Sequence, residues 1–211
     1  MRCLPLQSVT VEEVLAQLTE EVARLPPRGK AALFYLAGRA LFPLYIEFER
    51  RSGRTNSPAV ERALALARGF ICGAEADLSE FMALSEELNR TAPWGDEFDP
   101  PLSTFAQDVT ICVETSLRCA LESDVDARGV YYVLEPALQT ACEEDTGYLS
   151  DEKWYRRPIK NERLEAAVGC LARLVENLSN GAPLSRDQLE SLEVGAEKLF
   201  WMARSWITDS N

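Results

Sequence analysis

The chain has 211 residues, of which 46% are hydrophobic and 27% are charged, and its formal net charge at pH 7 is −12. This much apolar surface can offset the conformational entropy lost on folding, so an intrinsically disordered chain is excluded. The sequence has no uninterrupted apolar run of about 18 residues, and the N-terminal MRCLPLQSVTVEE lacks the apolar stretch of a signal peptide, so we expect a cytoplasmic protein.

Apolar residues recur with the 3.6-residue period of an amphipathic helix along most of the chain. Eight segments show this period: about 8–25, 28–51, 56 or 57 to 73, 77–90, 102–123, 124 or 126 to 144, 164–178 and 183–206. No segment predicts a strand, and no repeat at a fixed period suggests a solenoid. The pattern therefore predicts an all-α protein, a single compact multi-helix bundle of about eight helices that forms one domain over residues 1–211.

Local signals refine the helix ends. Thr10 and Glu13 are placed as a capping box at the start of the first helix. The second helix is apolar around most of its circumference, which is typical of a helix at the centre of a core, and Gly53 ends it. Asn56 or Ser57 is expected to cap the third helix with its side chain.

The charge is unevenly distributed along the chain. Residues 75–152 contain 19 acidic and 3 basic residues, a balance of −16, whereas the remaining 133 residues have a balance of +4. If the acidic segment gathers on one side, its field would repel nucleic acid and anionic lipid and would attract a basic partner. A solvated surface that only keeps the protein in solution would have the same composition, and that alternative stays open.

Two loops contribute to the predicted acidic surface: TAPWGDEFDPP (91–101), rich in proline, glycine and acids, and a second loop over 145–160. Aromatic residues inside the acidic segment favour a docking surface, because aromatic side chains often anchor protein interfaces. The residues predicted to bind a basic partner are Glu86, Glu87, Trp94, Asp96, Glu97, Phe98, Asp99, Glu143, Glu144 and Asp145.

The sequence lacks the residues of most enzyme mechanisms. It contains no histidine, which removes the commonest general base at neutral pH and the nucleophilic systems that depend on it. It has no GxxxxGK[ST] or GxGxxG loop for phosphates and no CxxC pair for zinc, and its six cysteines lie mostly among apolar residues, which predicts free thiols. We expect no catalytic residues, no metal and no cofactor.

Clustered carboxylates leave one enzymatic alternative, a magnesium-dependent hydrolase of a nucleotide. The residues that could form such a site are Glu75, Asp77 and Glu80, or Asp108 and Glu114 together with Glu143 and Glu144. A scaffold protein without a dedicated ligand is a third reading. The basic and aromatic run KWYRR (153–157) could suit nucleic acid, but its position beside the acidic segment favours pairing within the molecule.

The segment LAGRALFPLYIEFERRSGRTNSPAVERALALARGF resembles a bacterial all-helical family known only as a domain of unknown function. The residues that carry the resemblance are Arg39, Pro43, Tyr45 and Phe48, then Pro58, Arg62, Ala63 and Leu64, and the later helix FAQDVTICVETSLRCAL (105–121) with Asp108. Proteins of this kind include small acidic immunity proteins that protect bacteria against secreted toxins. The resemblance, over about half of the chain, implies a non-enzymatic immunity protein that neutralises a cognate toxin.

Overall fold

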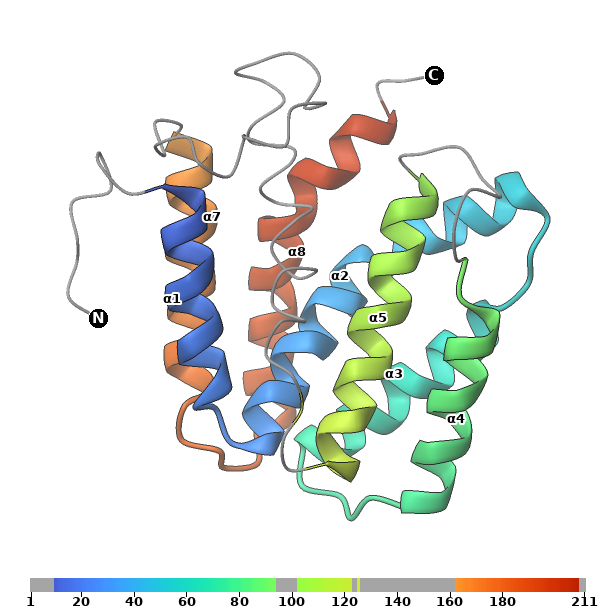
Figure 1. Cartoon of the computed structure of the whole chain (residues 1–211), viewed down its shortest axis with the longest axis horizontal. Coiled ribbons are helices and arrows are strands. Elements are labelled where there is room, and N and C mark those ends of the chain that lie inside the picture. Colours follow the sequence, from blue (N-terminus) through green and yellow to red (C-terminus); the bar gives the residue numbers. More distant parts are fainter. Residues whose placement is uncertain (1–9, 94–101, 123–124, 126–161, 209–211) are drawn as a thin grey trace.

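The computed structural model describes residues 10–93, 102–122, 125 and 162–208, and these residues are mostly helical (Figure 1). The helices are α1 (Val11–Ala23), α2 (Pro27–Ser52), α3 (Ser57–Ile71), α4 (Leu78–Thr91), α5 (Leu102–Leu121), α7 (Glu162–Leu178) and α8 (Arg186–Thr208). No strand occurs in these ranges. The predicted all-α class is confirmed for them, whereas the helix predicted to end at residue 144 and the two predicted loops lie largely outside the described residues.

The ends of the first two helices follow from the local sequence. The predicted capping box at α1 is confirmed: the backbone N of Glu13 donates to Thr10 Oγ1 at 3.2 Å, and the backbone N of Thr10 donates to Glu13 Oε2 at 2.8 Å. Pro27 occupies the first turn of α2, where a missing N–H costs nothing. Gly53 ends α2 as predicted, with φ 75°, a left-handed conformation that favours glycine.

α2 is the central helix, as predicted. It runs for 26 residues, continues through Pro43, and contacts α3, α5, α7 and α8 (Figure 1). Among the described helices, α2 is also the one with the length and composition to cross a membrane, and 78% of its most apolar window is buried inside the protein. A helix that is apolar around its whole circumference is buried in this way when other helices surround it, as they surround α2.

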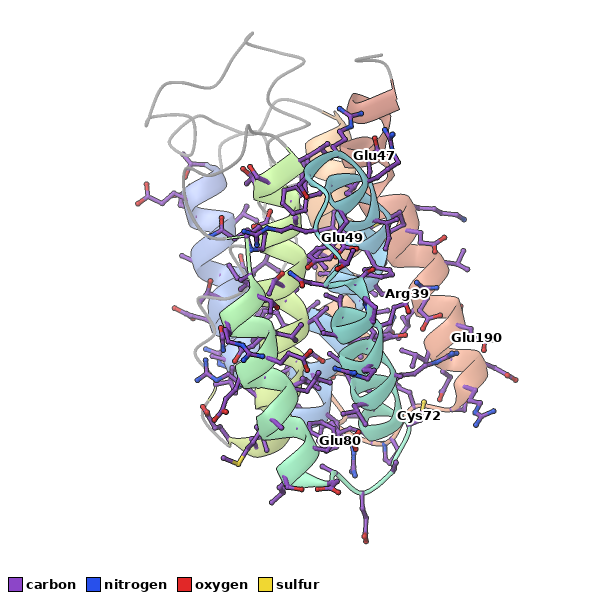
Figure 2. The ribbon with its side chains drawn as sticks, turned by 90° about the vertical axis from the view of Figure 1, so that its right-hand side faces the viewer. Arg39, Glu47, Glu49, Cys72, Glu80 and Glu190 are labelled. Atoms are coloured by element: carbon purple, nitrogen blue, oxygen red, sulfur yellow. The ribbon has the colours of Figure 1, made fainter. Side chains whose placement is uncertain are left out.

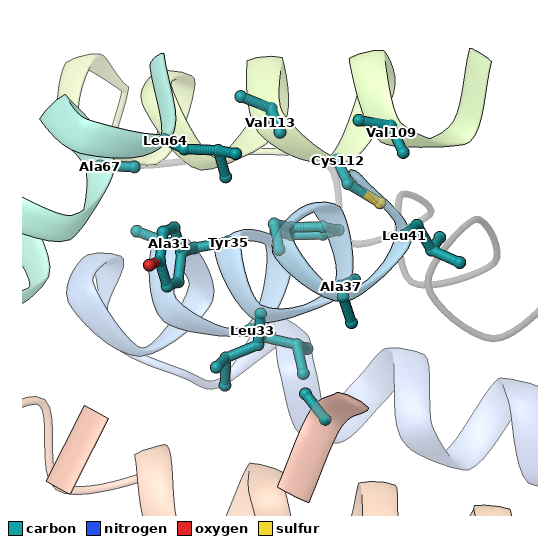
Figure 3. Packing of buried hydrophobic residues seen from close by; sticks show 14 of the residues in the cluster. Ala31, Leu33, Tyr35, Ala37, Leu41, Leu64, Ala67, Val109, Cys112 and Val113 are labelled. Carbon is teal, nitrogen blue, oxygen red and sulfur yellow. The ribbon is translucent and has the colours of Figure 1, made fainter. Parts of the chain in front are cut away.

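α5 packs most extensively on α2, and the two backbones approach closely. A Cβ atom added to Gly38 of α2 would lie 2.6 Å from Cγ2 of Val113, so only glycine fits at this contact. Figure 3 shows Val109, Cys112 and Val113 of α5 above the α2 side chains. The buried Ser116 of α5 donates a hydrogen bond of 2.8 Å to the carbonyl oxygen of Ala31, so its hydroxyl is paired across the same interface.

The start of α3 is stabilised differently from the prediction. Asn56 occupies the N-cap position, but its side chain makes no capping hydrogen bond. The buried carboxylate of Glu49, from the last two turns of α2, instead accepts hydrogen bonds from the backbone N of Asn56 and of Ser57. Sequence reasoning expected a local cap, and the cap came from seven residues upstream because the turn after Gly53 brings α2 against the N-terminus of α3.

The α2–α3 turn also holds the end of α4. Nη1 of Arg54 and Nδ2 of Asn56 donate to the carbonyl oxygen of Thr91, at 3.4 and 3.2 Å. These donors satisfy a carbonyl at the C-terminal end of α4 that has no partner within its own helix. The turn thus fixes the orientation of α4 at the edge of the protein.

The close contact between α2 and α5 predicts opposite effects for two glycine-to-alanine substitutions. Gly38→Ala should lower the free energy of unfolding by about 1 to 2 kcal/mol, because crowding against the stiff side chain of Val113 exceeds the gain in helix propensity. Gly195→Ala in α8 should raise it by up to about 1 kcal/mol, because nothing lies within 4 Å of the added Cβ. Chemical denaturation of both variants measures the difference, and equal stabilisation by both would contradict the close approach.

Candidate functional site

Two of the ten predicted partner-binding residues, Glu86 and Glu87, lie in the described part of the chain, both on α4. Glu86 is exposed. Glu87 is half-buried, and its Oε2 lies 2.7 Å from Nη2 of Arg62 on α3, so its charge is already paired within the chain. The remaining eight lie outside the described residues: Trp94, Asp96, Glu97, Phe98, Asp99, Glu143, Glu144 and Asp145. Their gathering with Glu86 stays a prediction.

α4 begins at a well-formed cap. Oδ1 of Asp77 accepts hydrogen bonds from the hydroxyl of Ser79 at 2.7 Å and from the backbone N of Ser79 and of Glu80 at 3.0 and 3.3 Å. These bonds, first the one from the Ser79 hydroxyl and then those from the backbone, lower the pKa of Asp77. Asp77 therefore remains ionised at the positive end of the helix and contributes to starting α4.

α4 turns one side to the core and leaves the other exposed. Phe81, Leu84, Ser85 and Leu88 are buried against the neighbouring helices. Three acids of this region, Glu75, Glu80 and Glu86, are exposed, and none of them forms an ion pair with a described cation. Figure 2 shows Glu80 near the N-terminal end of α4. Within the described ranges, the charges of these three acids are not neutralised by an ion pair.

Two large apolar side chains are also exposed on α4, one turn from Glu86 and about 160° around the helix from Glu80. Leu78 is 55% exposed and Met82 is 54% exposed, and they lie four residues apart, one turn from each other along the helix. Sequence reasoning missed this pair. The signal was present, because Met82 directly follows Phe81 and adjacent helical residues point about 100° apart, so both cannot face the core.

Two of the carboxylates considered for magnesium, Asp108 and Glu114, are buried on α5. Glu114 is buried on α5, and its Oε1 accepts hydrogen bonds from Ser85 Oγ at 2.8 Å and Asn89 Nδ2 at 3.2 Å, with Nε of Arg118 at 3.9 Å. No group of three or more acids or cysteines in the described ranges is arranged to hold a metal ion. Glu143 and Glu144 lie outside these ranges. The described carboxylates therefore lend no support to a magnesium-dependent hydrolase.

The described cysteines are free, as predicted: Cys72 and Cys170 are half-buried, and Cys112 and Cys119 are buried on α5. Burial raises the pKa of the Cys119 thiol to about 12 and that of Cys112 well above its usual value. Both remain protonated at neutral pH, and a protonated thiol is a poor nucleophile. These two cysteines act as small core residues.

A polar cluster ties α8 to α2 and α3. The hydroxyl of Tyr35 donates to Glu193 Oε1 at 2.5 Å, and Arg68 places Nη2 at 3.0 Å from Glu190 Oε1 and Nε at 3.8 Å from Glu193 Oε1. Figure 2 shows Arg39 and Glu190 on this side of the protein. Glu190 and Glu193 are each paired with Arg68 or Tyr35, so the cluster links α8 to α2 and α3. Neither of these two carboxylates is free to act as a base.

A small hollow lies where the N-terminal end of α2 meets α3 and the α7–α8 connection, but it leaves no room for a water molecule. Arg28 closes one side: its Nε donates to the carbonyl oxygen of Phe70 at 3.2 Å, and its guanidinium lies 5.2 Å from the centre of the Phe70 ring. An added Cβ at Gly181 would lie 2.5 Å from Pro26, so this junction is tightly packed. The hollow is therefore part of the packing between these segments, with no space for a ligand.

Comparison with known proteins gives no family: no family model matches the chain, and no curated protein matches it.

The buried tyrosines and thiols predict a loss of stability at alkaline pH. Burial raises the pKa of Tyr45 to about 12, and burial and the hydrogen bond to Glu193 raise that of Tyr35. As the pH rises, the unfolded chain releases these protons before the folded protein does. The stabilisation from the protonated groups is therefore fully present below about pH 8.5 and is lost as the pH rises toward 12. Each group lowers the free energy of unfolding by up to about 1.4 kcal/mol per pH unit. Urea unfolding at pH 8, 10 and 11 measures this, and Tyr45→Phe should reduce the slope between pH 10 and 11. An unfolding free energy that stays constant over this range would contradict the burial of these groups.

Proposed function

We propose that this protein is a non-enzymatic binding protein of the cytoplasm, which binds a basic protein partner through an acidic surface on the α4 side. The supporting observation is the set of exposed acids Glu75, Glu80 and Glu86, which have no ion pair with any described cation. They belong to the segment 75–152, whose balance is −16. A surface of this kind accelerates encounter with a basic protein and opposes nucleic acid.

Several acids outside this surface are paired with an arginine of the same helix. On α1, Glu20 lies 3.3 Å from Arg24, and on α2, Glu47 lies 2.7 Å from both Arg50 and Arg51. The hydrogen bonds from these two arginines lower the pKa of Glu47 to about 2. Such acids are paired within their own helix. The exposed acids around α4 have no such pairing, so their field extends into solvent.

We infer that the whole chain, 1–211, forms one compact bundle of about eight helices, with the acids of 94–101 and 126–152 on the same side as α4. For 94–101 the support is that α4 precedes this segment and α5 follows it, and that Ser85 and Asn89 of α4 are hydrogen-bonded to Glu114 of α5. Trp94 and Phe98 would then contribute aromatic contacts next to Glu86.

For the kind of partner, we propose a cognate toxin, so that the protein acts as an immunity protein. The support is the resemblance of residues 36–70 and 105–121 to the bacterial family described above, together with the acidic character of the chain. Co-expression with the product of the neighbouring gene tests this directly. A stable complex that suppresses toxicity supports the proposal, and a non-toxic neighbour that forms no complex contradicts it.

Two other functions are separable by experiment. A magnesium-dependent hydrolase requires acids from two helices in one pocket, and isothermal titration with Mg²⁺ would show binding at submillimolar concentration. A scaffold without a dedicated ligand predicts no partner of high affinity. Neither alternative requires two exposed apolar side chains on α4 near acids that form no ion pair with a described cation.

The proposal predicts that association with the partner depends on ionic strength and on the exposed acids Glu75, Glu80 and Glu86. Raising the salt from 0.1 M to 1 M shortens the Debye length from about 10 Å to about 3 Å and should slow association. The triple variant Glu75→Gln, Glu80→Gln, Glu86→Gln should slow association roughly three- to tenfold at low salt and change dissociation little. Surface plasmon resonance measures both rates.

A matched control carries the same change of charge elsewhere. Glu12→Gln, Glu176→Gln, Glu197→Gln neutralises three exposed acids on α1, α7 and α8. This control should associate like the wild type. If both triple variants slow association equally, net charge alone is responsible and α4 is not the docking side.

A further inference from the structure

Leu78 and Met82 are half of the large apolar side chains that are exposed in the described part of the chain, the others being Ile46 on α2 and Val194 on α8. Those two lie on different helices, whereas Leu78 and Met82 are one turn apart on α4. Covering two adjacent apolar side chains with another apolar surface is favourable, because it removes their exposed area from water. Together they form an apolar pair in the midst of charged and small residues.

The apolar pair belongs to a stripe that runs along the side of α4 next to α5. Residues 78, 82, 85 and 89 are spaced by four, three and four positions, so they share one side of the helix. The C-terminal half of this stripe, Ser85 and Asn89, contacts α5 through hydrogen bonds to Glu114. Its N-terminal half is the apolar pair, which remains exposed. A partner placed there would lie beside α5 as well as on α4.

The charges next to the apolar pair in sequence are acidic. Glu75 and Asp77 precede Leu78, and Glu86 follows Met82 by one turn. The nearest base of α4 in sequence is Arg90, two turns beyond Met82. An anionic membrane or a nucleic acid would be repelled by this arrangement, whereas lysine and arginine side chains would be attracted.

We propose that Leu78 and Met82 are the apolar anchor of the partner-binding surface, and that they receive an amphipathic helix whose large apolar side chains are flanked by lysine or arginine. The inference rests on the proposed function and specifies which segment of the partner docks, and where. The apolar contact slows dissociation, because the apolar side chains must be exposed to water again when the complex separates. The acids increase the rate of association with a basic partner. Helices with this pattern bind apolar grooves and helix faces by anchors at i, i+4 spacing.

The test uses a synthetic amphipathic helix of leucine and lysine as the probe, and fluorescence anisotropy as the measurement. The wild type should bind it. A peptide of the same composition with leucine distributed around the helix, and a peptide with glutamate in place of lysine, should bind at least about tenfold more weakly. The variant Leu78→Ser, Met82→Ser should weaken binding by about tenfold or more, since both side chains lose their remaining apolar burial.

Ile46→Ser, Val194→Ser is the matched control, because it removes two exposed apolar side chains of similar size elsewhere. It should bind like the wild type. The chain has three methionines, so ¹³C-methyl methionine spectra resolve Met82, assigned through Met82→Leu. Its methyl resonance should shift on addition of the leucine–lysine peptide and stay unchanged on addition of the glutamate peptide.

The outcomes separate the inference from the proposed function. If the Leu78 and Met82 variant binds like the control and the Met82 resonance does not move, while Glu75→Gln, Glu80→Gln, Glu86→Gln still weakens binding, the anchor is wrong and the acidic surface stands. If the acidic triple variant binds the peptide like the wild type, the proposed surface is wrong and the anchor with it. Equal binding of the amphipathic and distributed peptides also overturns the anchor.

Discussion

The packing of α2 against its neighbours is the constraint on which the rest of the structure depends. A helix of 26 residues with side chains buried on nearly every side is stable in water only if other helices cover it. α5 covers it most closely, at the contact between Gly38 and Val113, and α3, α7 and α8 cover other parts of its surface. This arrangement leaves α4 with only α5 and α3 as extensive described neighbours, so α4 lies at the edge and keeps an exposed side.

The burial of α2 and α5 also decides what the polar residues can do. Ser116, Glu49 and Glu114 are buried, and each is hydrogen-bonded to a backbone or side-chain group of another segment. In the described part of the chain no buried side-chain nitrogen or oxygen lacks a partner. A buried carboxylate that is fully engaged contributes to fixing one arrangement of helices, because removing its partner would leave a polar group unsatisfied. Polar groups available to another molecule are therefore those of the outer surfaces.

Sequence reasoning located the features that depend on local spacing. The capping box of Thr10 and Glu13, the central position of α2 and its end at Gly53 are all set by residues within a few positions of one another. It missed features that depend on which helices meet. The cap on α3 comes from Glu49, and the Glu87–Arg62 pair joins residues 25 positions apart. A helical period says that a side is apolar, but it does not say which neighbour covers it. For that reason the adjacency of Phe81 and Met82 showed that one of them is exposed, but not which one, nor that Leu78 is exposed beside it.

The two properties of α4 address different parts of a binding reaction. Charge acts over about 10 Å at moderate ionic strength, so unpaired acids influence the approach of a partner before any contact forms. Apolar burial acts only at contact, so Leu78 and Met82 influence how long a complex lasts. A solvated surface needs only the acids, and exposed apolar side chains among them would reduce its solubility. The occurrence of the apolar pair one turn from Glu86 is therefore the basis for proposing a surface that binds a protein over one that only keeps the chain in solution.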